Sequence, residues 1–227
     1  MLSHRLFEYD STMSYAVANL RPYHSFISFE QGVFMAIKLI VGLGNPGEQY
    51  MFTRHNAGFW FVHHLAQAFD ITLSHDKKFH GVTGRGRIHG SDVRLLMPLT
   101  FMNKSGQSVV PMVNFYGINN DELLIAHDEL DIPAGSIKLK TSGGHGGHNG
   151  LRDITPHIGN DFHRLRIGIG HPGHKSKVSG HVLSKAAPNE QIAIDSALTA
   201  AFEALPLLLE GDVEKARSQI NSFKMPE

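Results

Sequence analysis

The strongest constraint on the fold is a short apolar run that leads into a glycine-rich turn. Residues 38–41 read Lys-Leu-Ile-Val, a run typical of a buried β-strand. A turn containing three glycines follows over Gly42–Gly47, and the sequence Thr53–Gly58 comes shortly after it. A rigid strand end therefore brings the side chains of Asn45 and His55 and a flexible stretch of backbone into one small region.

The predicted elements alternate from this strand onward, and a chain of 227 residues is long enough for one domain with a sizeable core. Apolar runs and alternating patterns predict strands at about 37–42, 80–88, 92–97, 123–126, 137–140 and 164–169. Helical spacing predicts helices at about 56–69, 104–116, 150–158, from Pro188 onward and at about 213–222. This alternation predicts an α/β fold: a single-domain three-layer sandwich with a mixed, mostly parallel twisted sheet flanked by helices.

Residues 1–34 differ from the rest of the chain, because they show no clear helical or strand period. No apolar run of signal-peptide length follows a basic start, and Met35 reads like a natural beginning. We expect residues 1–34 to be an extension from an upstream start or an added segment, poorly ordered and without a catalytic role. Residues 35–227 then form the folded domain.

The composition excludes several kinds of protein and site. The sequence contains no cysteine, which rules out disulfide bonds, thiolate nucleophiles and thiolate metal sites. No apolar run approaches the roughly 20 residues that span a bilayer, so we expect no membrane partner. Both features fit a cytoplasmic protein, and we predict that location.

Positive charge is concentrated in one part of a chain whose formal net charge is zero. Residues 136–186 hold eight Lys and Arg against two acids, whereas residues 187–227 hold three against seven. A basic block of this kind is typical of a surface that binds a polyanion. A solvated face balanced by the acidic tail explains the same pattern equally well, so charge alone leaves both interpretations open.

Two familiar motifs fit the sequence poorly. Gly42, Gly44 and Gly47 match a dinucleotide-binding pattern, but residues 48–54 separate the third glycine from any convincing helix that would bind the pyrophosphate. The sequence contains no His-Glu-x-x-His motif, and the candidate ligands lie beside glycines or basic residues instead of carboxylates: His145, His148, His163, His171 and His174. We therefore predict neither a cofactor nor a metal ion.

Polar residues stand at or near the predicted ends of strands and starts of helices, where α/β folds place their chemistry. They are Asn45, His55, Asn103, Asp128 and Asn149. A His with a nearby Asp can act as a general base, because the carboxylate fixes the tautomer and stabilises the imidazolium that forms. Without a cysteine or a Gly-x-Ser-x-Gly motif, water is the expected nucleophile. Taken singly, each Asn is better explained by turn or cap chemistry.

Taken together, these residues and their surroundings resemble bacterial-type peptidyl-tRNA hydrolase. The matching stretches, in the order of the family, are residues 38–47, 53–58, 101–106, 127–131, 143–151 and 162–173. The resemblance covers the domain from about residue 35 to the C-terminus, and the extension 1–34 is the one departure. It implies hydrolysis of the ester that joins a peptide or N-blocked aminoacyl group to the 3′-terminal ribose of tRNA. The released tRNA and peptide are then recycled in translation, and no metal is required.

The resemblance also implies roles for individual residues. His55 resembles the catalytic base of the family and Asp128 its partner, while Asn45 resembles the residue that helps to distinguish N-blocked from free aminoacyl-tRNA. Six more residues resemble contacts to the substrate or tRNA, or residues that line the cleft: Tyr50, Phe101, Met102, Asn103, His148 and Asn149. The chemistry agrees, because a neutral His can take a proton from water at about pH 7 and an Asn amide can stabilise an oxyanion.

The basic block supplies candidate ligands for the phosphates of tRNA. They are Lys138, Lys140, Arg166, Lys175 and Lys177. Such contacts give affinity without sequence preference, which suits an enzyme that acts on many tRNAs. We expect the glycine-rich residues 143–150 to form a flexible gate. The expected partner is peptidyl-tRNA, bound through its 3′ acceptor end and phosphates by a monomer that needs no cofactor.

Two other functions stay open from the sequence. The same basic face would serve a non-catalytic RNA-binding protein, and the glycine-rich turn would serve a nucleotide-dependent oxidoreductase. Loss of turnover with retained RNA binding in Asp128→Asn separates the enzyme from the binding protein. A thermal shift induced by NAD would support the oxidoreductase.

Overall fold

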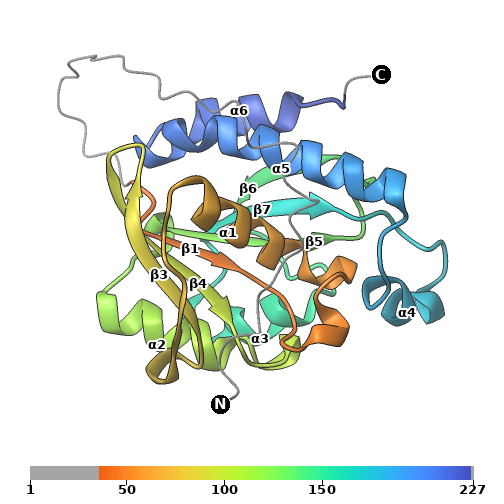
Figure 1. Cartoon of the computed structure of the whole chain (residues 1–227), viewed down its shortest axis with the longest axis horizontal. Helices are drawn as coiled ribbons and strands as arrows, with labels where there is room; N and C mark the ends of the chain where they lie inside the picture. The colour runs from red at the N-terminus through yellow and green to blue at the C-terminus, as the bar shows by residue number, and fades with distance from the viewer. Residues whose placement is uncertain (1–35, 226–227) are drawn as a thin grey trace.

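The computed structural model describes residues 36–225, so the predicted extension 1–34 lies outside the described residues. One seven-stranded sheet forms the centre of the molecule, in the order β2-β3-β4-β1-β5-β7-β6 (Figure 1). The strands are β1 (Leu39–Gly42), β2 (Ser74–Asp76), β3 (Gly81–Ile88), β4 (Ser91–Pro98), β5 (Leu123–Glu129), β6 (Ile137–Thr141) and β7 (His163–Gly168). The α-helices are α1 (Ala57–Ala68), α2 (Gly106–Tyr116), α3 (Asn149–Ile158), α4 (Val178–Val182), α5 (Pro188–Leu209) and α6 (Val213–Ser222).

Five of the seven strands run in the same direction. β4, β1, β5 and β7 pair in parallel, whereas β3 is antiparallel to β2 and β4, and β6 is antiparallel to β7. Val41 at the centre lies opposite Leu96 on β4 and Ile125 on β5. From β1 the chain crosses to the edge strand β2, returns through β3 to β4 beside β1, and then crosses to β5 on the other side of β1. The carboxyl ends of β1 and β5 therefore border the point where the strand order reverses, which is where α/β folds bind ligands.

Helices cover both faces of the sheet and give the three layers predicted from the sequence (Figure 1). α1, α5 and α6 pack on one face, and α2 and α3 pack on the other. Side chains along β1 alternate between these two cores: Ile40 packs with α1 and α5, whereas Leu39 and Val41 pack with α2 and α3. The predicted fold class is confirmed.

α5 is long and apolar enough, by length and composition alone, to cross a membrane. Just over half of its most apolar stretch, 56%, is buried inside the molecule. The helix packs against α6, β6 and β7, and Glu190, Asp195 and Glu203 interrupt its apolar sequence. Its apolar side chains therefore fill the core between the helix and the sheet.

The glycines around the first turn are explained by helix packing. A Cβ on Gly42 would lie 2.1 Å from the carbonyl oxygen of Gly58, and a Cβ on Gly58 would lie 2.3 Å from the carbonyl oxygen of Ala126. α1 therefore packs directly on the backbone of β1 and β5, at a distance that only glycine permits. Two 3₁₀ turns then separate Gly47 from α1. These contacts explain Gly42 and Gly58 by close packing of backbone on backbone.

Most predicted elements lie within two residues of the observed ones, with a few differences. β5 continues to Glu129, so His127 and Asp128 lie in the strand and not after it. α2 begins at Gly106 and keeps Pro111 inside the helix. β2 and α4, which have three and five residues, are too short to show a period and were not predicted.

Candidate active site

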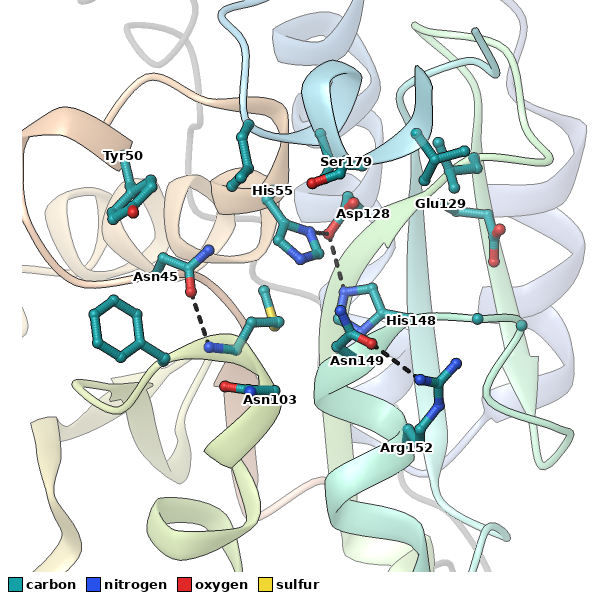
Figure 2. Close-up of a pocket in the computed structure, with 18 of the residues that line it drawn as sticks. Asn45, Tyr50, His55, Asn103, Asp128, Glu129, His148, Asn149, Arg152 and Ser179 are labelled. Atoms are coloured by element: carbon teal, nitrogen blue, oxygen red, sulfur yellow. Dashed lines mark hydrogen bonds and ion pairs between the residues drawn. The ribbon is translucent and has the colours of Figure 1, made fainter. Parts of the chain in front are cut away.

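A cleft of about 770 Å³ opens at the carboxyl ends of β1 and β5 (Figure 2). Segments far apart in the sequence meet there: the turn after β1, the turn before α2, the end of β5, the start of α3 and the region of α4. Ten residues predicted from the sequence line this cleft: Asn45, Tyr50, His55, Phe101, Met102, Asn103, Asp128, His148, Asn149 and Lys175. The structure thus brings together all nine predicted residues outside the basic block, and one from within it.

His55 and Asp128 form a buried pair in this cleft. The 3₁₀ turn η3 (Arg54–Asn56) carries His55 at its centre, and β5 carries Asp128 near its carboxyl end. Nδ1 of His55 lies 2.8 Å from Oδ1 of Asp128. Nε2 of His148 lies 3.0 Å from the same oxygen. One carboxylate oxygen therefore holds two imidazole rings in place (Figure 2).

The electrostatics of this cluster keep Asp128 ionised. Burial raises the pKa of Asp128, but the charges and hydrogen bonds of His55 and His148 outweigh burial and hold that pKa well below its usual range. Burial lowers the pKa of His55, but the charge and the hydrogen bond of Asp128 outweigh it and raise the pKa above 6.5. With its proton on Nδ1 and donated to Asp128, neutral His55 keeps a lone pair on Nε2. That nitrogen can accept a proton, as a general base must.

Backbone contacts orient the amide of Asn45. Its Oδ1 accepts a hydrogen bond from the N–H of Met102 at 2.8 Å, so its NH₂ group is the donor available to a ligand. Asn56 holds the backbone of Asn45: its Oδ1 accepts from the N–H of Asn45 at 2.8 Å, and its Nδ2 donates to the carbonyl oxygen of Asn45 at 3.0 Å. Asn56 was missed in the sequence, although it adjoins His55 in the same motif.

Other predicted residues lie at the mouth of the cleft. Asn103 and Asn149 are exposed there, and Oδ1 of Asn149 accepts a hydrogen bond from Nη1 of Arg152 at 3.3 Å. Phe101 is 56% exposed, whereas its neighbour Met102 is buried. An exposed aromatic ring beside amide donors is suited to contact a flat, polar ligand.

The five basic residues predicted to hold phosphates separate into three groups. Lys175 lines the main cleft. Lys140 and Arg166 line a second cavity of about 230 Å³. Nζ of Lys138 donates to a backbone carbonyl oxygen of α6 at 2.6 Å, and Lys177 lines neither cavity. The structure therefore brings three of these residues to a cavity and leaves Lys138 and Lys177 outside both.

Nine further residues line the main cleft: Glu129, Leu130, Gly146, Gly147, Arg152, Val178, Ser179, Val182 and Leu183. Some of them carried a signal in the sequence, because Glu129 follows Asp128 directly and Arg152 belongs to the basic block. Glu129 also lines the second cavity, where its Oε2 accepts from Nε of Arg166 at 2.9 Å. The wall formed by residues 178–183 shows no helical period in the sequence, because α4 has only five residues.

The glycine-rich segment expected to act as a gate is anchored at one end. Nη1 and Nη2 of the buried Arg164 donate to the carbonyl oxygens of Gly144 and Gly143, each at 2.6 Å. Gly146 and Gly147, which have positive φ angles, line the cleft beyond this anchor. The motion of residues 143–150 stays a prediction.

Within the described residues, one group of three side chains has the spacing to hold a metal ion. It consists of His55, Asp128 and His148, whose ligand atoms lie within 4.8 Å of one another. Both imidazoles already bond to the carboxylate of Asp128. The metal-free mechanism stays a prediction.

Comparison with known proteins relates this geometry to a family. The sequence model of the family described as peptidyl-tRNA hydrolase matches residues 39–227. A peptidyl-tRNA hydrolase from Psychrobacter arcticus is 91% identical over 193 residues, which cover 85% of this chain and 100% of the relative. One from Acinetobacter baumannii is 63% identical over 188 residues, which cover 83% of this chain and 97% of the relative.

Solved structures give the same relationship. The crystal structure of peptidyl-tRNA hydrolase from Acinetobacter baumannii is 62% identical in sequence and has a TM-score of 0.83. The match covers 86% of this chain and 99% of that one. A complex of peptidyl-tRNA hydrolase with N-propanol has a TM-score of 0.84 at 62% identity.

Proposed function

Because this chain belongs to the peptidyl-tRNA hydrolase family and hydrolyses the ester bond of peptidyl-tRNA, we propose that His55 and Asp128 activate water for that reaction. The observation that carries the proposal is the buried 2.8 Å contact between Nδ1 of His55 and Oδ1 of Asp128 in the cleft. This contact leaves Nε2 of His55 to take the proton of water, and it places a carboxylate where imidazolium forms.

The reaction proceeds in two proton transfers. His55 removes a proton from water as the oxygen attacks the ester carbonyl, which forms a tetrahedral intermediate. The bond to the 3′ oxygen of the ribose then breaks, and that oxygen takes the proton back from His55. The peptide leaves as a carboxylic acid, which ionises and releases its proton to solvent, and tRNA leaves with its 3′ hydroxyl. The ionised Asp128 stabilises the imidazolium between the two steps.

Amide donors at the cleft supply the electrostatic part of catalysis and recognition. The NH₂ group of Asn45 is the donor for the carbonyl of an N-blocked substrate, since its Oδ1 is held by Met102. Asn103 or Asn149 stabilises the oxyanion of the intermediate. Removing one such donor in other hydrolases costs about 10²- to 10³-fold in rate.

Contacts at the mouth of the cleft bind the tRNA. Phe101 or Tyr50 stacks on the terminal base, a contact worth about 1–3 kcal/mol. Lys175, beside the cleft, and Lys140 and Arg166, in the second cavity, hold phosphates of the acceptor end. Lys138 and Lys177 lie outside both cavities and contribute less.

The same chemistry needs no metal ion, since the His–Asp pair supplies the base and the amides supply the positive potential. We also propose that the protein acts as a monomer in the cytoplasm, where peptidyl-tRNA is produced. Light scattering of the purified protein tests the oligomeric state. Imaging of the tagged full chain in its host tests the location.

The decisive experiment measures release of free tRNA from N-acetyl-aminoacyl-tRNA in EDTA. Wild type, His55→Ala and Asp128→Asn are compared, and tRNA binding of each protein is measured in parallel. We expect the wild type to cleave in EDTA and both variants to lose turnover while they still bind tRNA.

Each other outcome rejects a specific part of the proposal. Cleavage by the wild type that stops in EDTA and returns with added metal would reject the metal-free mechanism. Unchanged turnover in His55→Ala would reject the assigned base. No cleavage by any of the three proteins, with tRNA binding intact, would favour an RNA-binding function of the same surface.

A further inference from the structure

One turn of 3₁₀ helix connects three parts of the active site. In η3 the side chain of His55 bonds to Asp128, and the side chain of the next residue, Asn56, holds the backbone of Asn45. The residue before His55, Arg54, points in a third direction, towards residues 181–190, which run from the end of α4 to the start of α5. Arg54 does not line the cleft, and neither the proposed mechanism nor the resemblance gives it a role.

Both terminal nitrogens of the Arg54 guanidinium bond to this segment, whereas its buried Nε has no hydrogen-bond partner. Nη1 donates to Oγ of Ser184 at 2.7 Å and to the carbonyl oxygen of Lys185 at 2.8 Å. Longer contacts from Nη1 reach the carbonyl oxygens of Ser184 and His181 at 3.3 and 3.4 Å. Nη2 bonds to Oε2 of Glu190 at 2.5 Å. The side chain is 8% exposed, so these bonds form in a site that is mostly shielded from water.

The backbones of the two segments are joined at the same place. The N–H of Arg54 donates to the carbonyl oxygen of Ser184 at 3.1 Å, and Thr53 forms an isolated β-bridge with Lys185. Glu190, the partner of the guanidinium, also accepts a hydrogen bond from the N–H of Ala187 at 2.9 Å at the start of α5. The connection between η3 and the start of α5 is therefore made by backbone, charge and side-chain contacts together.

We call this connection the joint; it is formed by Thr53 and Arg54 with Ser184, Lys185 and Glu190. The joint lies directly beside one wall of the cleft. Four residues of the wall come from α4 and the residue that follows it: Val178, Ser179, Val182 and Leu183. The next residue, Ser184, is the main partner of Arg54. α4 has only five residues and one buried side chain, so its own packing fixes its position weakly. His181 in α4 also contacts the carbonyl oxygen of Ile169 through Nε2 at 3.0 Å, and the joint at Arg54 ties this wall to the turn that carries His55.

We propose that Arg54 is a positioning residue, which locks the wall formed by residues 178–183 to the turn that carries His55. A substrate ester held against this wall then meets the base at a fixed distance. Small misplacements of a bound substrate reduce rates strongly, by about 10²-fold for 1 Å. The inference rests on the proposed use of His55 as the base.

Arg54→Lys is the informative substitution, because Lys keeps the charge but lacks the planar fork that reaches several acceptors at once. We expect kcat/KM for N-acetyl-aminoacyl-tRNA to fall by about 10- to 100-fold. In this variant, hydrogen exchange should become faster at the backbone N–H of residue 54, which bonds to the carbonyl oxygen of Ser184 in the wild type. Exchange in the core strand β5 should stay as slow as in the wild type.

Arg85→Lys is the matched control. Arg85 also forms a forked ion pair, with Asp92, but on an exposed strand outside the cleft, and we expect wild-type kcat/KM and exchange. Glu190→Gln is the second test variant, since it removes one charge from the joint and leaves the fork in place. It should lower kcat/KM by about threefold or more and speed exchange at the N–H of Arg54.

The outcomes separate a positioning role from a general structural one. Wild-type kcat/KM in folded Arg54→Lys would overturn the proposal, as would a fall in kcat/KM accompanied by equally faster exchange in β5. If Arg54→Lys does not fold, Glu190→Gln decides, and unchanged kcat/KM and exchange in that variant would overturn the proposal. The exchange results do not depend on which group is the base, so failure of the His55 assignment is recognised separately by turnover in His55→Ala.

Discussion

The contact between His55 and Asp128 determines the pH range in which the base is available. Protonated His55 cannot accept a proton, so kcat/KM should fall as the pH falls through the pKa of His55. Asp128 raises that pKa by its charge and hydrogen bond, against the effect of burial. We expect the midpoint of the acid limb to lie above 6.5, as measured by a pH profile of kcat/KM with the wild type.

Asp128→Asn tests the cause of this shift. The substitution removes both contributions that raise the pKa and leaves burial, which lowers it. The midpoint should move below 6.5, and the rate should fall by about 10²- to 10⁴-fold, because an amide also permits the wrong tautomer. NMR titration of the His55 ring gives the same pKa without turnover, and Asp92→Asn, on an exposed strand, is the control. An unchanged midpoint in Asp128→Asn would refute this account.

Single residues also show where sequence reasoning was sufficient. His55 and Asp128 are 73 positions apart, and their motifs identified both. The direction of the Asn45 amide depends on Met102, 57 positions away, and no local pattern indicates that contact. Motifs name the chemical group at a site, whereas the partner that orients the group is fixed by tertiary packing.

The element η7 (Lys175–Lys177) allows the basic contacts to be tested within a single turn. Lys175 lines the cleft and Lys177 does not, although both are exposed and lie two residues apart. A lysine that neutralises a phosphate releases counterions, so Lys175→Ala should weaken tRNA binding and lower the salt slope of the binding constant by about one. Lys177→Ala should change the slope much less. Equal salt slopes in both variants would show that lining the cleft does not decide which lysine contacts phosphate.

Elements differ in how well the sequence predicts them. α1 and α5 bury nine and eleven residues, and long apolar segments of this kind are easily recognised in a sequence. α4 buries only Val182, so its five residues show no periodic pattern to detect. β5 was predicted to end too early, because His127 and Asp128 are polar residues in a strand that is buried throughout. Functional residues interrupt the pattern that identifies the element carrying them.

The sequence predicted the fold of the whole molecule more completely than it predicted the site. Apolar runs specify strands buried on both faces, and the alternation of strands with helices specifies the layers. The second cavity beside Lys140 and Arg166 did not follow, because β6 and β7 bring these residues together by antiparallel pairing across the sheet edge. Pairing between strands that are distant in the chain produces no pattern in the sequence of either strand.

Removal of residues 1–34 tests the predicted division of the chain. Every predicted site residue and both cores lie within residues 36–225. The relative from Psychrobacter arcticus matches this chain over 193 residues, which are its full length. A protein of residues 35–227 should therefore keep kcat/KM within about twofold of the full chain and keep its melting temperature.

The control for this truncation is a protein that starts at Leu43 and so lacks β1, which pairs with both β4 and β5. It should not fold, because removal of a central strand separates the two halves of the sheet. A lower KM or a higher kcat on removal of residues 1–34 would mean that the extension covers the cleft. A lower melting temperature with unchanged kinetics would mean that the extension stabilises the domain. Either result would contradict the prediction that residues 1–34 serve neither folding nor catalysis.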